Sequence, residues 1–197
     1  MFEVDGVDSR LEVVRFTLGE SISALFELEL DLACSNRELD LAGLVRRPAL
    51  LTIRSPHDDD VPRLVHGIVL SASQGRQDER VAIYHLRVGP RVWPLLHRRD
   101  CRIFQDRNTR QIVEEVLRGA GLPADAVRFN LSEPLPTRGY CVQYRESDWD
   151  FVRRLLEEDG LFHCFEHAED HHTLLIGDGP GAHPDIPGAR ELLFNDV

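Results

Sequence analysis

The 197-residue sequence contains no lysine: all 23 of its basic residues are arginine, against 34 acidic residues, for a formal net charge of −11. Such acidity disfavours a nucleic-acid-binding protein, which needs a basic surface. No apolar run approaches 18 residues, so no membrane-spanning helix is predicted. The acidic, mixed first ten residues do not resemble a secretory signal peptide. We therefore expect a soluble protein made in the cytosol, which stays there unless a signal-independent route exports it.

Cysteine is scarce and widely spaced. The four cysteines form no CxxC pair, which argues against a zinc finger or a thioredoxin-like motif; they are Cys34, Cys101, Cys141 and Cys164. Because disulfides are rare in the cytosol, we expect these thiols to be free.

The motifs of common catalytic and cofactor sites are also missing. The sequence has no G-x-S-x-G, and its Gly- and Pro-rich stretch GDGPGAHPDIPG lacks the Lys-Ser/Thr ending of a phosphate loop. The aspartate run at 58–60 lacks the spacing of a calcium loop and is expected to be a solvated loop tip. The carboxylates between Glu146 and Asp159 are explained by a helix N-terminus and its surface. We predict no catalytic, cofactor-binding or metal-ligating residue.

The first ninety residues show the alternation of β-strands. Strands are predicted at 11–18, 24–33, 49–54, 63–73 and 80–88, with one helical turn at 39–44. The last two strands form a hairpin whose turn, 74–79, has Gly75 at its centre. In the second strand one face is apolar, with Phe26, Leu28, Leu30 and Leu32. Short strands with spaced turns indicate a small antiparallel barrel or sandwich.

The second half mixes helix and strand. Asn108 is placed to cap a helix whose third residue is Gln111, and Ser147 to cap another. Residues 125–139 are expected to be connecting structure, with further strands at 161–166, 173–176 and 191–195. The fold class predicted is α+β, mainly β. An antiparallel β-barrel-like subdomain, 1–90, precedes a mixed α+β subdomain with two amphipathic helices, 91–197.

The stretch 140–167, YCVQYRESDWDFVRRLLEEDGLFHCFEH, joins a strand, a capped helix and a second strand. One helical face is apolar, and its members Trp149, Phe151, Val152, Leu155 and Leu156 are predicted to be buried. Gly160 stands where a helix is closed by a left-handed residue. The opposite face, including Arg153 and Glu157, and the His-rich turn are expected to meet solvent or a partner.

Two clusters carry weak functional signals. Arginines between Arg87 and Arg102 suit phosphate or an acidic protein, although a solvated strand end explains them better. Neutral imidazoles can bind zinc or nickel, and four lie close in sequence: His163, His167, His171 and His172. His163 and His167 are over 13 Å apart on one strand, by a rise of about 3.3 Å per residue, so they cannot share an ion. His167 with His171 or His172 remains a candidate pair.

Several blocks, in order, resemble one known family. They include LEVVRFTLGESISALFELELDL, GLVRRPALLTI, VHGIV, YHLRVGPRVWPLLHRRDCRIFQD, QIVEEVL and the stretch 140–167 with HHTLLIGD behind it. This pattern is similar to the N-terminal head region of VgrG, the trimeric spike of the type VI secretion system, whose head resembles the hub of contractile phage baseplates. The resemblance covers nearly the whole chain.

The resemblance implies a structural protein and not an enzyme. Its partners would be further copies in a homotrimer, the hexameric Hcp tube, baseplate proteins and effectors, with no nucleic acid and no small-molecule substrate. Secretion would proceed through the type VI apparatus without a signal peptide. A contractile phage or prophage tail hub is the close alternative. A metal-dependent hydrolase using the cluster from His163 to His172 is the contrasting one.

Overall fold

The computed structural model describes residues 1–55 and 58–183, without the side chains of residues 55–61. The strand expected at 191–195 lies outside the described residues. The backbone at 58–60 begins a strand, where the sequence predicted a loop tip. Among the described helices, none combines the length and the apolar character that a membrane crossing requires.

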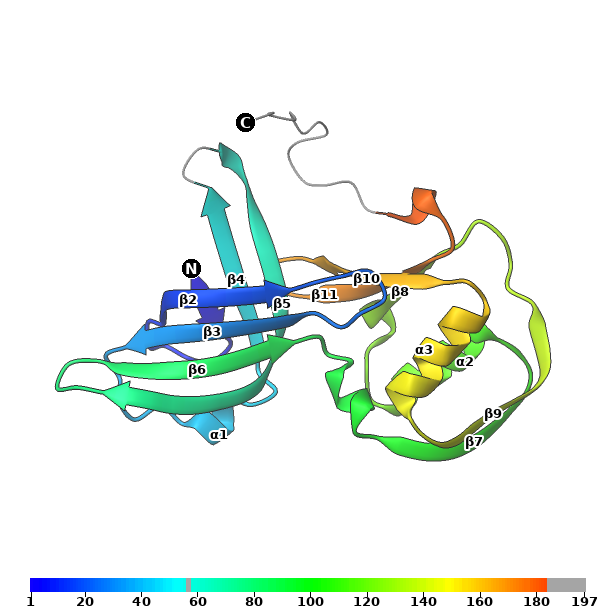
Figure 1. Ribbon diagram of the computed structural model, residues 1–197, viewed down its shortest axis with the longest axis horizontal. Helices are drawn as coiled ribbons and strands as arrows, with labels where there is room; N and C mark the ends of the chain where they lie inside the picture. Colours follow the sequence, from blue (N-terminus) through cyan, green and yellow to red (C-terminus); the bar gives the residue numbers. More distant parts are fainter. Residues whose placement is uncertain (56–57, 184–197) are drawn as a thin grey trace, which may run out of the picture.

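A six-stranded antiparallel sheet forms the first part of the fold, in the order β1-β4-β5-β6-β3-β2. Its strands are β1 (Phe2–Val4), β2 (Glu12–Gly19), β3 (Glu27–Cys34), β4 (Pro48–Ser55), β5 (Asp58–Gln77) and β6 (Ala82–Gly89). A bridge between Phe2 and Leu11 brings the two edges together, so the sheet curls into an incomplete barrel (Figure 1). Register shifts in the β2–β3 and β5–β6 pairs indicate bulges, which bend strands and favour such a curl.

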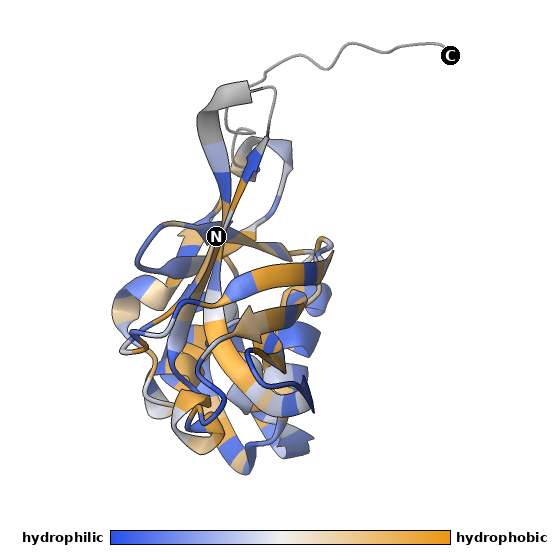
Figure 2. Ribbon diagram, turned by 90° about the vertical axis from the view of Figure 1, so that its left-hand side faces the viewer, coloured by the Kyte–Doolittle hydropathy of each residue, from blue (hydrophilic) through white to orange (hydrophobic). Residues whose placement is uncertain are grey.

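The concave side of this sheet holds the first core. The predicted apolar face of the second strand is confirmed, because all four of its members are buried: Phe26, Leu28, Leu30 and Leu32. Figure 2 shows the alternation of apolar and polar residues along the strands. Helix α1 (Leu41–Leu44), capped by the Asp40 side chain, adds the buried Leu44. Gly67 on β5 lets the Phe26 ring approach, since a Cβ there would lie 2.6 Å from Val88 and 3.3 Å from that ring.

Two helices and a two-stranded ribbon make up most of the second part. Its elements are the 3₁₀ turn η1 (Trp93–Leu96), strand β7 (Arg99–Asn108), helix α2 (Thr109–Gly119), strand β9 (Thr137–Ser147) and helix α3 (Asp148–Glu158). Asn108 and Gln111 form the predicted capping box of α2, and Ser147 caps α3. The five predicted apolar residues of α3 are all buried against α2 and the ribbon. Gly160 has φ +68°, which confirms its left-handed role after α3.

A three-stranded sheet lies between the barrel and the helices (Figure 1). It has the order β10-β11-β8 and consists of β10 (Phe162–His167), β11 (His172–Gly177) and β8 (Val127–Asn130), which runs parallel to β11. Short 3₁₀ turns, η2 (Ala124–Ala126) and η3 (Pro180–Ala182), flank this sheet in sequence. Phe165 of β10 packs against both the first core and the second core, which is built around α2 and α3.

Two expectations about elements were wrong, and a third was right only in part. Residues 125–139 are not only connecting structure, because they contain β8 and the start of β9. Strand β5 continues to Gln77, so Gly75 lies within the strand and the turn is instead closed by Asp78, which bonds Val81 through its backbone. The turn residues Glu169, Asp170 and His171 are exposed, as expected, but His163 and His172 on the flanking strands are buried.

The predicted fold class is confirmed as a large curled antiparallel sheet with a smaller mixed sheet and amphipathic helices. The division at residue 90 stays a prediction. The first core takes its buried members from residues 2–88 and the second from residues 92–176.

Candidate functional site

Three histidines meet where the barrel contacts the β10–β11 hairpin. The Nδ1 atoms of His66 on β5 and His172 on β11 are 2.9 Å apart. The backbone N–H of His66 donates to Nδ1 of His167 on β10 at 3.1 Å. Phe26 lies edge-on to both hairpin histidines, with ring centroids 4.9 and 5.8 Å away. The sequence patterns pointed to the two hairpin histidines but not to His66, which is 106 residues from His172.

The hydrogen bonds fix the tautomers of His66 and His172. Nε2 of His172 accepts the backbone N–H of Arg91 at 2.9 Å, so its proton is on Nδ1 and is donated to His66. His66 therefore carries its own proton on Nε2. Nδ1 of His167 lies 3.1 Å from both the backbone nitrogen and the carbonyl oxygen of His66, and its Nε2 is 3.4 Å from the Glu20 carboxylate. His66 and His172 form a pair of neutral rings.

Burial keeps His66 and His172 neutral. Desolvation, with Arg91 and neighbouring histidines adding repulsion, lowers the pKa of His66 to about 4 and that of His172 to about 3. The His167 imidazole beside it lowers the pKa of Glu20. The contact between His66 and His172 therefore joins two parts of the fold through an uncharged hydrogen bond.

The structure does not assemble the metal set considered from the sequence. His171 is exposed and pairs with Asp170 at 2.7 Å, while both ring nitrogens of His172 are engaged in hydrogen bonds. Within residues 1–55 and 58–183, no three His, Cys, Asp or Glu side chains are grouped as a metal site requires. His163 is separate: its ring packs edge-on against Trp149 at 5.2 Å, and burial lowers its pKa to about 4.

Most of the arginine stretch is occupied by internal ion pairs. Arg87 pairs with Glu27, and the fully buried Asp148 binds both Arg98, at 3.2 Å, and Arg102. The predicted strand end with a solvated rim therefore describes only part of the stretch. The structure gives these arginines mainly a structural role.

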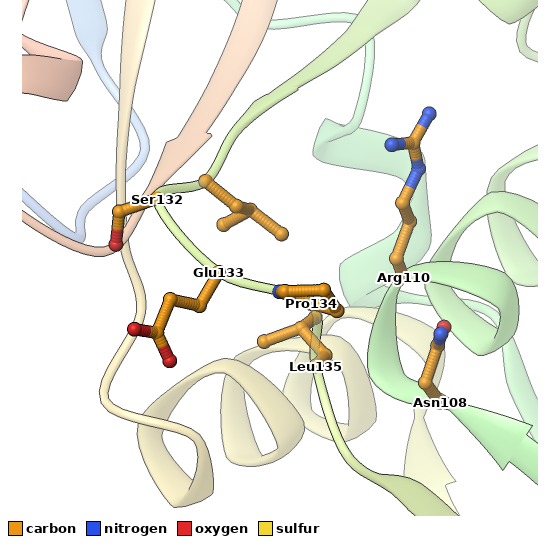
Figure 3. Close-up of a pocket in the computed structure, with 7 residues that line it drawn as sticks. Asn108, Arg110, Ser132, Glu133, Pro134 and Leu135 are labelled. Atoms are coloured by element: carbon orange, nitrogen blue, oxygen red, sulfur yellow. The ribbon is translucent and has the colours of Figure 1, made fainter.

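A surface groove of about 380 Å³ lies beside the N-terminus of α2 (Figure 3). It is lined by Asn108, Arg110, Leu131, Ser132, Glu133, Pro134 and Leu135. Asn108 caps α2, Arg110 pairs with Glu114, and Ser132 hydrogen-bonds to Asp178. Because these polar groups serve the fold, the groove is not a convergent reactive centre.

The outer face of the β7–β9 ribbon is apolar and exposed. Ile103, Tyr140 and Tyr144 are 61–65% exposed, and the strand register puts all three on the same face. Edge strand β2 also presents Val14 and Phe16 to solvent. Clustered exposed apolar residues mark interaction surfaces. The ribbon face is therefore a candidate contact surface.

The chain belongs to the phage tail baseplate hub (GPD) family, whose model matches residues 19–197. The hub-like resemblance read from the sequence blocks is thereby confirmed.

Among curated proteins, those similar to this chain include three type VI secretion system spike proteins. VgrG4b of Pseudomonas aeruginosa is 39% identical over 93% of this chain and 22% of its own length. VgrG1b of the same organism is 37% identical over 93% and 24%. VgrG3 of Vibrio cholerae is 32% identical over 98% and 19%. The chain thus spans about a fifth to a quarter of these relatives.

Solved structures share the fold. An Escherichia coli component of the type VI secretion system matches 92% of this chain and 50% of its own, with a TM-score of 0.85 and 24% identity. A tail protein from Neisseria meningitidis matches 94% and 52%, with a TM-score of 0.62 and 14% identity. Both structures therefore share the incomplete barrel and the helical part of this chain.

Proposed function

We propose that this chain is part of the head of a type VI secretion spike. Its similarity to VgrG spike proteins over 93% of its length carries the proposal. In this role the head forms a homotrimer, docks on the hexameric Hcp tube and, with baseplate proteins, carries effectors out of the cell without a signal peptide. Its relatives are spike proteins, which supports a structural and not an enzymatic role.

The exposed ribbon face supports assembly. A homotrimer repeats one heterologous contact around a threefold axis, and such contacts need an apolar centre with a polar rim. Ile103, Tyr140 and Tyr144 supply apolar and aromatic surface of this kind, and arginines border it on both strands. We assign this face to contacts within the spike.

A pull-down with purified Hcp hexamer tests the docking. The protein is expected to retain Hcp in the pull-down and to have the mass of a trimer in light scattering. Tyr144→Glu should reduce the trimer fraction, whereas Ile22→Glu, at an equally exposed aliphatic residue in the turn before β3, should not. The proposal would be refuted if the protein neither bound Hcp nor formed trimers.

A phage or prophage tail hub is the second candidate, favoured by the likeness to the Neisseria meningitidis tail protein. Neighbouring genes separate the two. Genes for type VI components beside this one would support the spike, and a tail gene cluster would support the hub.

A further inference from the structure

A second cleft, of about 390 Å³, opens between the barrel and the helical part. It is bounded by the loop before β4, by β5, by η1 and by the end of α2, so both parts of the fold contribute. Its lining is Arg46, Pro48, Ile68, Arg91, Pro94, Leu95, Arg98, Ala120, Gly121, Leu122 and Pro123. The volume falls within the roughly 300–1,000 Å³ typical of ligand pockets.

Three arginines line this cleft, and its lining has no carboxylate. Arg98 is held by the buried Asp148 and by the carbonyl of Gly119. The side chains of Arg46 and Arg91 make no ion pair or hydrogen bond with any described residue. Two guanidinium groups without an ion pair thus face one cleft.

The backbone holds Arg46 in an uncommon conformation. Its φ is +72°, a left-handed value that side chains with a Cβ rarely adopt. Hydrogen bonds on either side fix it there: Arg46 N–H donates to Val69 at 2.7 Å, and Val69 N–H donates to Arg47 at 2.9 Å. Locally strained residues cluster at binding sites, where the surrounding fold maintains them.

The rest of the lining is apolar and rich in proline. Ile68 and Leu95 are buried at the floor, while Pro94 and Pro123 form exposed walls. A lone phosphate would use only the arginines. A peptide that carries a carboxylate beside an aliphatic side chain would use both the arginines and the apolar lining. Guanidinium groups bind carboxylates through paired hydrogen bonds.

We propose that this cleft binds an acidic, leucine-containing peptide segment of a partner protein, with a carboxylate between Arg46 and Arg91 and an aliphatic side chain against Leu95 and the prolines. This site goes beyond the proposed function, since it does not depend on Hcp docking or on trimer formation. The positive charge of the cleft favours an acidic segment over a neutral or basic one.

Fluorescence anisotropy with the 197-residue chain tests the site, using a labelled peptide Gly-Leu-Asp-Leu-Glu-Leu-Gly. Arg46→Gln and Arg91→Gln should each weaken binding by about tenfold, as expected when one member of a close charge pair is lost. Arg80→Gln, which makes the same charge change in the exposed β5–β6 turn, should leave binding unchanged. A peptide with Asn and Gln in place of the acids should bind at least about tenfold more weakly.

Three results would overturn the proposal: no binding by the wild-type chain, an equal loss in Arg80→Gln, or displacement of the peptide by inorganic phosphate as effective as by unlabelled peptide. Urea unfolding of each variant confirms that the cleft has been changed without loss of the fold. The double variant Arg46→Gln, Arg91→Gln should bind no better than either single one.

Discussion

The carboxylate of Asp148 ties three elements together at the start of α3. It is fully buried and accepts hydrogen bonds from Gln143, at 2.8 Å, and Arg102, while Arg98 lies at 3.2 Å. Its backbone N–H also donates to the carbonyl of Arg98 at 2.7 Å. A negative charge in the first helical turn is favoured by the helix dipole. One residue therefore joins the segment between η1 and β7, the ribbon and α3.

Asp148→Asn should lower the free energy of unfolding by roughly 2–4 kcal/mol. The variant leaves two arginine charges without their shared partner, and partial solvation of both arginines makes the loss smaller than for a fully buried pair. Urea unfolding measures it. Glu157→Gln, at an exposed ion pair on the same helix, should change stability by under about 1 kcal/mol. Equal effects of the two substitutions would contradict the assigned role.

His163 makes stability depend on pH. Burial lowers its pKa from 6.5 to about 4 in the folded protein, so below pH 6.5 the unfolded chain binds a proton that the native state refuses. The contribution of neutral His163 to the free energy of unfolding is fully present above pH 6.5 and is lost as the pH falls toward 4. His66 and His172 shift in the same direction.

His163→Leu should therefore flatten the stability profile. When the pH is lowered from 7.5 to 5, the free energy of unfolding of the variant should rise by roughly 2 kcal/mol relative to that of wild type. The reason is that leucine has no proton to bind. Urea unfolding at several pH values reports this difference directly. Gln105→Leu, at an exposed residue without a titratable group, should run parallel to wild type. A parallel profile for His163→Leu would show that its burial does not control the titration.

At the scale of elements, α3 is the main contributor to the second core. Trp149→Ala should destabilise the protein by about 3–5 kcal/mol, because the 4% exposed indole packs against His163 and would leave a cavity. Thermal unfolding followed by circular dichroism is the measurement. Arg153→Ala on the solvent face should cost under about 1 kcal/mol. An unchanged melting temperature for Trp149→Ala would show that the helix is not central.

Elements with local signals were predictable from the sequence. The caps of α2 and α3 rest on residues three positions apart, Asn108 with Gln111 and Ser147 with Asp150, so the sequence indicates both helix starts. Strand β8 has only four residues, and its partner β11 lies about 45 residues later. Because its stability comes from that distant pairing, no local pattern revealed it.

Sites built from distant residues could not be predicted in the same way. The contact between His66 and His172 and the cleft between Arg46 and Arg91 both depend on how the barrel meets the helical part. Composition indicated the arginine excess of the stretch from Arg87 to Arg102 but not that most of it is internally paired. Tertiary contacts decide which charges remain available to a partner.

At the scale of the whole molecule, the two cores should unfold together. Phe165 belongs to both, and Ser23 N–H on the barrel side donates to the carbonyl of His163 at 2.8 Å. Tryptophan fluorescence reports Trp93 and Trp149, whereas far-ultraviolet circular dichroism is sensitive to the strands of the barrel. The two urea transitions should coincide. Separate midpoints would show that the histidine contacts do not couple the cores.

The hairpin contacts also set an order of events as the chain is made. His66 contacts partners that lie 101 and 106 residues later in the chain. Closing so long a loop costs conformational entropy, which delays the formation of these contacts. On the ribosome, the barrel strands emerge well before β10 and β11, at about 5–20 residues per second. For several seconds Phe26 and His66 are therefore not covered by the β10–β11 hairpin, and the nascent barrel exposes apolar side chains at this end. This interval is when a chaperone would have most to protect.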